Sequence, residues 1–185
     1  MSDTKLIRGC CKILLPELIE RGDKFNAVMI DPPYNVSATG AKIVRGTKGI
    51  YLGKDISLDF GEWDKGSLHW LDFIDLIPKL LFDNGVFVMF YDKLELGIVG
   101  MYLQEKYKFQ VRHIGNWIKS NPSPQARKVR WQNGSESFLI ATANTGSGHH
   151  FNYKLGQSPD WFMTSVNYEH EHPTQKPLSV MTWLA

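Results

Sequence analysis

The 185-residue sequence has little cysteine and no long apolar run. Its only two cysteines, Cys10 and Cys11, are adjacent, which suits neither a disulfide between them nor the ligand spacing of a zinc site. No apolar stretch approaches the roughly 20 residues of a membrane-spanning helix, and the N-terminus does not follow the pattern of a signal peptide. The sequence therefore predicts reduced thiols, a cytoplasmic location and no membrane partner.

A strong excess of charge of either sign is also missing. The 21 lysines and arginines nearly balance the 19 aspartates and glutamates, for a formal net charge of +2 at pH 7. This balance permits a nucleic-acid partner without predicting one, because phosphate binding depends on a local basic patch. The sequence has no internal repeat, and its length predicts a single domain over residues 1–185 with a sizeable core.

The tetrapeptide Asp31-Pro32-Pro33-Tyr34 directly follows an apolar run, residues 25–30, that predicts a buried strand. The prolines end sheet pairing, so nearby carbonyl oxygens are left to accept other hydrogen bonds. The carboxyl end of a strand is where open α/β sheets bind ligands. The Asp31 carboxylate and the Pro32 carbonyl suit the exocyclic amine of a planar ring, with Tyr34 stacking on that ring. An ordinary turn is the alternative, because aspartate and proline also follow strands in turns.

The rest of the chain alternates between helical and strand patterns. This order predicts an α/β fold with a doubly wound, mainly parallel sheet. Pro78 should kink the second helix, Asn84-Gly85 should end it, and the third should have Leu94, Ile98, Met101 and Tyr102 on one apolar face. The predicted helices are residues 10–20, 67–82 and 93–106, and the further strands are residues 86–90, 109–119 and 137–143.

Two loops carry cations that suit DNA phosphates. Residues 35–59 interleave glycine with lysine and arginine, which favours a flexible lid, and residues 120–134 place three cations next to Trp131 and Asn133. Merely hydrated surface loops are the alternative for both. Lys119, at the end of the strand before the second loop, is added to the candidate DNA contacts. These are Lys42, Arg45, Lys48, Lys119, Asn121, Arg127, Lys128 and Arg130.

The polar interval 144–171 and the residue that follows it contain four histidines. His149, His150, His170 and His172 show neither the spacing nor the thiolates of a metal site, so no metal is expected.

Two motifs together resemble the amino-group DNA methyltransferases, which methylate adenine N6 or cytosine N4 with S-adenosylmethionine. Asp31-Pro32-Pro33-Tyr34 is similar to their signature. The segment His172-Pro173-Thr174-Gln175-Lys176-Pro177-Leu178 resembles one that follows the signature in the permuted, or β, class. The intervening stretches Glu62-Trp63-Asp64, Trp117-Ile118-Lys119 with Asn121-Pro122, and Glu136-Ser137-Phe138-Leu139 also fall in the order of that family.

The resemblance implies a methyltransferase-type sheet and site-specific methylation of double-stranded DNA, as in restriction–modification. The target base would be flipped out of the duplex. Aspartate at the head of the signature favours adenine N6, cytosine N4 being the alternative, and residues 144–171 would be a short target-recognition insertion. By the same resemblance, the catalytic residues are Asp31, Pro32, Pro33 and Tyr34, and the cofactor-binding residues are Asp31, His172, Thr174, Gln175 and Lys176.

The chain departs from that family after residue 177. In the permuted order a helix, a strand and a glycine turn follow, and that turn forms much of the cofactor site, whereas this sequence stops at Ala185. We therefore expect an incomplete sheet with an exposed edge, weak cofactor binding by the chain alone, and completion by a missing segment or a second polypeptide. The resemblance also admits a homodimer.

Two other functions remain open. One is a DNA-binding remnant without catalysis. The other is methylation of a different amide, such as a protein glutamine, although such enzymes usually carry asparagine where this chain has Asp31.

Overall fold

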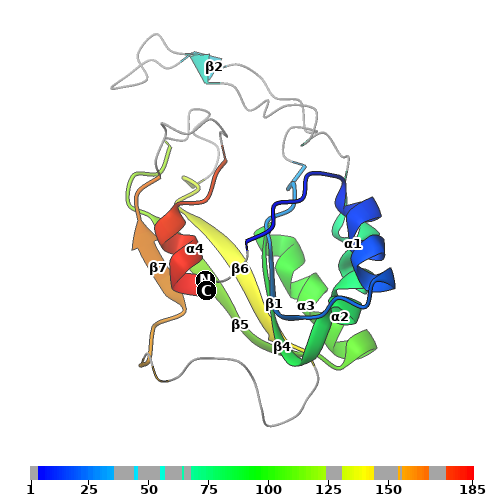
Figure 1. The fold of residues 1–185 in the computed structure, drawn as a ribbon. Coiled ribbons are helices and arrows are strands. Elements are labelled where there is room, and N and C mark those ends of the chain that lie inside the picture. Colours follow the sequence, from blue (N-terminus) through cyan, green and yellow to red (C-terminus); the bar gives the residue numbers. More distant parts are fainter. Residues whose placement is uncertain are drawn as a thin grey trace.

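A five-stranded sheet forms the centre of the computed structural model, which describes residues 4–35, 44–45, 55–56, 64, 68–123, 131–143, 154, 156–166 and 174–185. The strand order is β1-β4-β6-β5-β7 (Figure 1). In that order the strands are β1 (Phe25–Ile30), β4 (Leu81–Tyr91), β6 (Ser135–Thr142), β5 (Gln110–Lys119) and β7 (Trp161–Thr164). Two short strands, β2 (Val44–Arg45) and β3 (Asp55–Ile56), pair separately.

Four of the five strands run in the same direction. β1 pairs with β4 in parallel and β5 pairs with β7 in parallel, while β6 is antiparallel to both of its neighbours, β4 and β5. The predicted mainly parallel sheet is confirmed, with β6 as its one reversed strand. As a consequence, β6 begins at the edge where the other four strands end.

Helices cover both faces of the sheet, as a doubly wound fold requires. α1 (Cys11–Glu20), α2 (Ile77–Leu80) and α3 (Lys93–Tyr107) lie on one face, and α4 (Leu178–Leu184) lies on the other (Figure 1). Side chains of a strand alternate between its faces. In β4, Phe87, Met89 and Tyr91 accordingly join the core under α3, while Val88 and Phe90 join the core under α4. Among the described residues, no helix has both the length and the apolar character needed to cross a lipid bilayer.

The predicted helix over residues 67–82 is wrong in extent. The chain there forms two 3-10 turns, η4 (Trp70–Asp72) and η5 (Ile74–Leu76), before the single α-helical turn of α2. Pro78 lies in the first turn of α2, where its missing N–H group costs no helical hydrogen bond. Asn84-Gly85 does not end a helix but lies inside β4, with Asn84 at a φ of 65°. The pairing with β1 slips there, since Phe25 faces Leu81 but Ala27 faces Val86.

The third predicted helix is confirmed, but its buried face differs from the predicted one. Leu96, Val99, Gly100 and Leu103 are buried on α3, whereas Leu94 is 85% exposed. Ile98 and Met101 are exposed too, and Tyr102 is half-buried. The cause is the small residue Gly100, where an added Cβ would lie 3.1 Å from Val111, so the helix backbone approaches the sheet along this side.

Candidate active site

The turn after β1 fixes the position of the tetrapeptide. β1 ends at Ile30, and Asp31 follows at the carboxyl edge of the parallel strands with its side chain 34% exposed. Asn35 then adopts a left-handed conformation, with a φ of 55°. Its backbone N–H donates to Asp64 Oδ1 at 2.8 Å, and its side-chain amide donates to the Leu68 carbonyl at 2.9 Å. Asp64 is buried, so this anchor is shielded from water.

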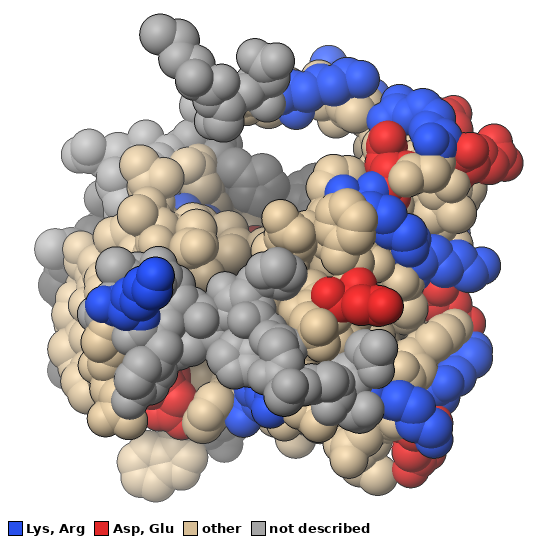
Figure 2. Space-filling model, turned by 60° about the horizontal axis from the view of Figure 1, so that its bottom comes forward, with Lys and Arg blue, Asp and Glu red and all other residues tan. Residues whose placement is uncertain are grey.

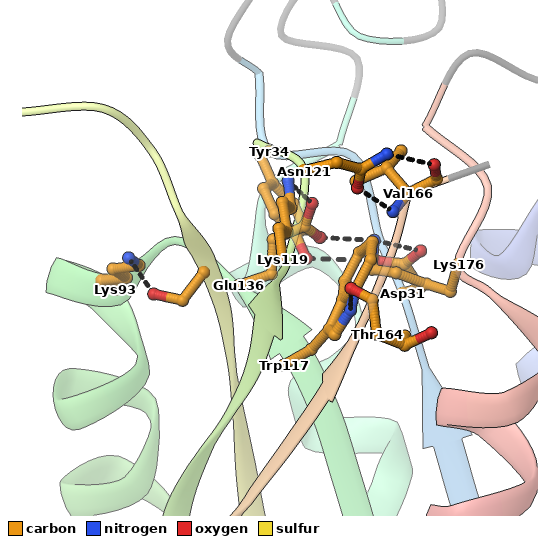
Figure 3. A network of polar contacts seen from close by, with 11 residues as sticks. Asp31, Tyr34, Lys93, Trp117, Lys119, Asn121, Glu136, Thr164, Val166 and Lys176 are labelled. Atoms are coloured by element: carbon orange, nitrogen blue, oxygen red, sulfur yellow. Dashed lines mark hydrogen bonds and ion pairs between the residues drawn. The ribbon is translucent and has the colours of Figure 1, made fainter. Parts of the chain in front are cut away.

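Four side chains of alternating charge meet at this edge and are called here the charge network: Asp31, Lys176, Glu136 and Lys119 (Figure 3). Lys176 Nζ donates to Asp31 Oδ1 and Oδ2 at 2.9 and 2.8 Å and lies 3.0 Å from Glu136 Oε2. Lys119 Nζ lies 2.5 Å from Glu136 Oε1. The Lys176 side chain is only 6% exposed, so water screens these ion pairs weakly.

The sheet topology explains why residues so far apart in sequence meet. Asp31 follows the last residue of β1, Lys119 is the last residue of β5, and Glu136 is the second residue of the reversed strand β6. The ends of β1 and β5 and the start of β6 therefore share one edge. Lys176 reaches the same edge from the segment just before α4.

Aromatic rings line one side of the network. The Tyr34 hydroxyl donates to Asp31 Oδ1 at 3.2 Å, and its ring packs edge-on against Tyr91, with the centroids 5.6 Å apart. Lys176 Nζ lies 5.3 Å from the centre of the Tyr34 ring and 5.2 Å from that of Phe90. A cation near ring faces is stabilised electrostatically, which favours a buried ammonium group here.

The surroundings move the pKa values of the two carboxyl groups in opposite directions. Burial raises the pKa of Asp31, with Lys176 offsetting part of the effect and the negative charge of Glu136 adding to it. Burial would likewise raise the pKa of Glu136, but Lys176 and Lys119 outweigh it and hold that pKa below its usual value. Burial and the two carboxylates raise the pKa of Tyr34, so its phenol stays a hydrogen-bond donor.

The structure brings the two predicted motifs together. Pro32, Pro33 and Tyr34 are half-buried beside Asp31, and Lys176 binds Asp31 directly. Thr174 is half-buried and Gln175 exposed, immediately before Lys176. His172, predicted to bind the cofactor, lies outside the described residues, as do His149, His150 and His170.

The sequence reasoning did not assign a role to Glu136. Glu136 contacts both lysines of the network. The signal that could have found it was a carboxylate at the start of a buried strand, in a stretch that already matched the order of the family.

The described residues give limited information on the predicted DNA contacts. Lys119 is largely buried, pairs with Glu136 and lies 5.0 Å from the Trp117 ring centre, so its charge is used within the site. Asn121 donates to the Val166 carbonyl at 3.0 Å and accepts from the Val166 N–H at 2.6 Å. On the face shown in Figure 2, positive and negative side chains are interspersed among uncharged ones. The structure does not describe five of the remaining predicted contacts: Lys42, Lys48, Arg127, Lys128 and Arg130. For Arg45 it describes the backbone but not the side chain.

Comparisons with known proteins agree with this arrangement. A family model described as DNA methylase, of the N6/N4 methyltransferase type, matches residues 25–184. The crystal structure of the M1.HpyAVI-SAM complex is similar to this chain with a TM-score of 0.63 at 20% identity, covering 92% of this chain and 68% of that one. The crystal structure of M1.HpyAVI gives a TM-score of 0.56 at 18% identity, covering 93% of this chain and 68% of that one. At these identities the two structures show a shared fold.

Proposed function

Because this chain belongs to the DNA methylase family of the N6/N4 type, we propose that it carries the catalytic centre of a DNA adenine-N6 methyltransferase. The observation that supports this best is the contact between Lys176 and Asp31, which lie 145 positions apart. Each residue belongs to one of the two motifs on which the resemblance rests. Their ion pair places both motifs at the carboxyl edge of the sheet, where α/β folds bind ligands.

In the proposed reaction Asp31 and Pro32 hold the target amine. The lone pair of an exocyclic amine is delocalised into its ring, and hydrogen bonds to the Asp31 carboxylate and the Pro32 carbonyl favour a pyramidal nitrogen. These bonds strengthen as positive charge develops on the nitrogen, so they stabilise the transition state. A carbon–nitrogen bond forms, the carbon–sulfur bond breaks with its electron pair left on sulfur, and one amine proton leaves toward Asp31 or water.

The residues at this edge fit the methionine end of S-adenosylmethionine. When bound, this cofactor supplies a methyl group on a positively charged sulfur. The partly exposed Asp31 carboxylate and the adjacent Tyr34 ring suit such a cation. Thr174 and Gln175 provide a hydroxyl and an amide beside Lys176. We assign these residues to that end of the cofactor.

The DNA partner follows from the chemistry. A base inside a duplex cannot place its amine against Asp31, so the base must leave the stack, and Tyr34 would hold its face. Since Lys176 lies over the Tyr34 ring, the base would use the part of the ring that Lys176 leaves open. Within the proposed recognition interval 144–171, Trp161–Thr164 forms the edge strand β7, and the proposal places target recognition in the rest of the interval.

We propose further that the chain follows the permuted order of the β class and that β1 receives an additional strand. In the described part of the chain β1 pairs with β4 alone, and its apolar Phe25 is 39% exposed. Strands of parallel sheets are normally covered on both sides, and an open apolar edge favours pairing with another strand. The strand would come from a further segment or a second polypeptide and would complete the cofactor pocket.

Calorimetry on the 185-residue chain tests this part of the proposal. We expect no measurable heat of S-adenosylmethionine binding for the chain alone, and binding once the completing polypeptide is present. Tight binding by the chain alone would show that the pocket needs no added strand.

A methylation assay tests the activity. Duplex DNA and radiolabelled S-adenosylmethionine are incubated with the chain, with and without the products of neighbouring genes, and the digested DNA is analysed for N6-methyladenine and N4-methylcytosine. Asp31→Ala should abolish transfer while DNA binding, measured by fluorescence anisotropy, persists. The matched control Asp75→Asn removes a surface carboxylate that binds Lys106 and should leave transfer unchanged.

Each outcome of that assay has a clear meaning. Wild-type turnover in Asp31→Ala would refute the catalytic assignment. N4-methylcytosine as the product would replace the adenine target by cytosine. DNA binding without transfer in every combination would favour the non-catalytic DNA-binding protein instead.

A further inference from the structure

Lys176 makes two hydrogen bonds and one further ion pair within the charge network. A lysine ammonium has three N–H donors. Three carboxylate oxygens surround Nζ, namely Asp31 Oδ1 at 2.9 Å, Asp31 Oδ2 at 2.8 Å and Glu136 Oε2 at 3.0 Å. Because the side chain is almost fully buried, a missing third acceptor would leave a donor without compensation. Glu136 therefore supplies the third carboxylate oxygen around the ammonium group of Lys176.

Glu136 is itself anchored and does not depend on Lys176 for its position. Its other oxygen pairs with Lys119 across adjacent strands, since Glu136 on β6 faces Trp117 on β5. Both side chains are largely buried, and Lys119 is further held over the Trp117 ring. Because both side chains are packed inside the protein, this pair holds the Glu136 carboxylate in a fixed position beside Lys176.

The position of Glu136 divides the charge of Lys176 between two carboxylates. Among the residues that the structure describes, the titratable and charged groups that face Asp31 are Tyr34 from its own turn, Lys176 from the segment before α4, and Glu136 from β6. If Lys176 faced Asp31 alone, its full positive charge would weaken Asp31 as a hydrogen-bond acceptor. A second carboxylate on the same ammonium restores the electron density that a developing positive amine requires.

We infer that Glu136 is a positioning residue for the proposed methyl transfer, acting through Lys176 to keep the Asp31 carboxylate oriented and basic. This inference rests on the proposed function for its catalytic consequence. The arrangement of the three side chains is a property of the chain itself (Figure 3). It can therefore be tested apart from methylation.

The first test is a carbon-13 NMR titration of the Asp31 carboxyl group. Glu136→Gln keeps the size of the side chain and removes its charge, so the Asp31 midpoint should fall by about one pH unit. Lys176→Met should move the same midpoint upward, because the positive charge is lost. Opposite shifts from two neighbouring substitutions are not expected from general loosening of the fold. Asp75→Asn is the matched control and should leave the midpoint unchanged.

The second test is the pH dependence of methyl transfer in an active preparation. Glu136→Gln should move the acid limb of the kcat profile to lower pH and reduce kcat about 10-fold, with KM for DNA unchanged. Glu136→Asp, which keeps the charge on a shorter side chain, should recover part of the loss. A merely structural role would lower activity without moving the limb.

The two proposals fail in different ways. Absent methylation in the wild type together with the expected NMR shifts would refute the proposed function and leave the arrangement of charges intact. An unchanged Asp31 midpoint in folded Glu136→Gln would overturn the role of Glu136. If that variant does not fold, Glu136→Asp is used instead, and it should lower the Asp31 midpoint by a smaller amount. An unchanged Asp31 midpoint in Glu136→Asp would then overturn the inference.

Discussion

Replacing Lys176 with methionine is the sharpest test of the charge network. The substitution keeps the unbranched apolar stem and removes the ammonium group that three carboxylate oxygens contact. Asp31 then loses its lysine partner, and it lies near Glu136, which keeps only Lys119 as a positive partner. The fold should persist but lose stability, and the loss should depend on pH.

The magnitude follows from burial. Removing one partner of a buried ion pair typically costs about 3–5 kcal/mol. The Asp31 side chain is 34% exposed, so water screens part of the repulsion and we expect about 2 kcal/mol. In a chain of this size that corresponds to a decrease in Tm of roughly 4–8 °C.

The sign of the pH dependence separates charge loss from lost packing. In the wild type the folded pKa of Glu136 lies below its unfolded value, so its stabilisation is present at neutral pH and lost as the pH falls through the folded pKa. In the variant, mutual repulsion raises the folded pKa values of the two carboxyl groups. The folded variant then takes up protons more readily than the unfolded chain, and the difference from wild type shrinks as the pH falls.

Thermal unfolding followed by circular dichroism at about pH 7.5 and about pH 5 measures this difference. The decrease in Tm should be largest at the higher pH. Lys106→Met, which breaks an exposed pair with Asp75, is the control and should change Tm little at either pH. A decrease for Lys176→Met that is equal at both values, or larger at the lower one, would refute the reasoning.

Three further predictions concern packing and the DNA surface. A Cβ at Gly115 would lie 2.4 Å from Phe138, so Gly115→Ala should cost about 1–3 kcal/mol in urea unfolding, whereas Gly97→Ala on open helix surface should gain about 0.5–1 kcal/mol. Equal effects of the two alanines would contradict this packing. Leu94→Gln should change the free energy of unfolding by no more than about 0.5 kcal/mol, because the side chain is exposed. A large loss of stability would show that Leu94 is buried in the core. Trp131→Ala should weaken DNA binding in fluorescence anisotropy without changing Tm, since Trp131 is 95% exposed beside the predicted basic segment, and unchanged affinity would remove it from the DNA surface.

Local sequence patterns predicted those parts of the molecule that depend on local physics. The apolar run before Asp31 forms β1, and the prolines end it, because strand periodicity and the missing proline N–H act over a few residues. The predicted burial of this strand is wrong, since its first three residues are exposed and its last three half-buried. In the described part of the chain β1 is an edge strand that pairs with β4 alone, which a local pattern does not record. The prediction that Asn84-Gly85 ends a helix was wrong, because the local sequence does not decide between two structures. A residue with positive φ suits both a helix end and an irregularity within a strand, and only the pairing with β1 decides between them.

The remaining features depend on contacts that no local pattern records. The alternation of side chains is the same in parallel and antiparallel strands, so the reversal of β6 left no trace in the sequence. Because β6 is reversed, Glu136 at its start meets Lys176 at the edge where β1 and β5 end, and this meeting depends on strand order rather than on a local pattern. Hydrophobicity likewise predicted that Leu94 would be buried on α3, whereas the helix packs against the sheet through the side that carries Gly100.

The separation of Asp31 and Lys176 along the chain also has a kinetic consequence. A contact between residues 145 positions apart costs more conformational entropy to close than a local contact, so it should form after the local ones. On the ribosome, the pairing cannot occur until the second motif has emerged. Until then, a nascent polypeptide would carry its signature aspartate without its lysine partner.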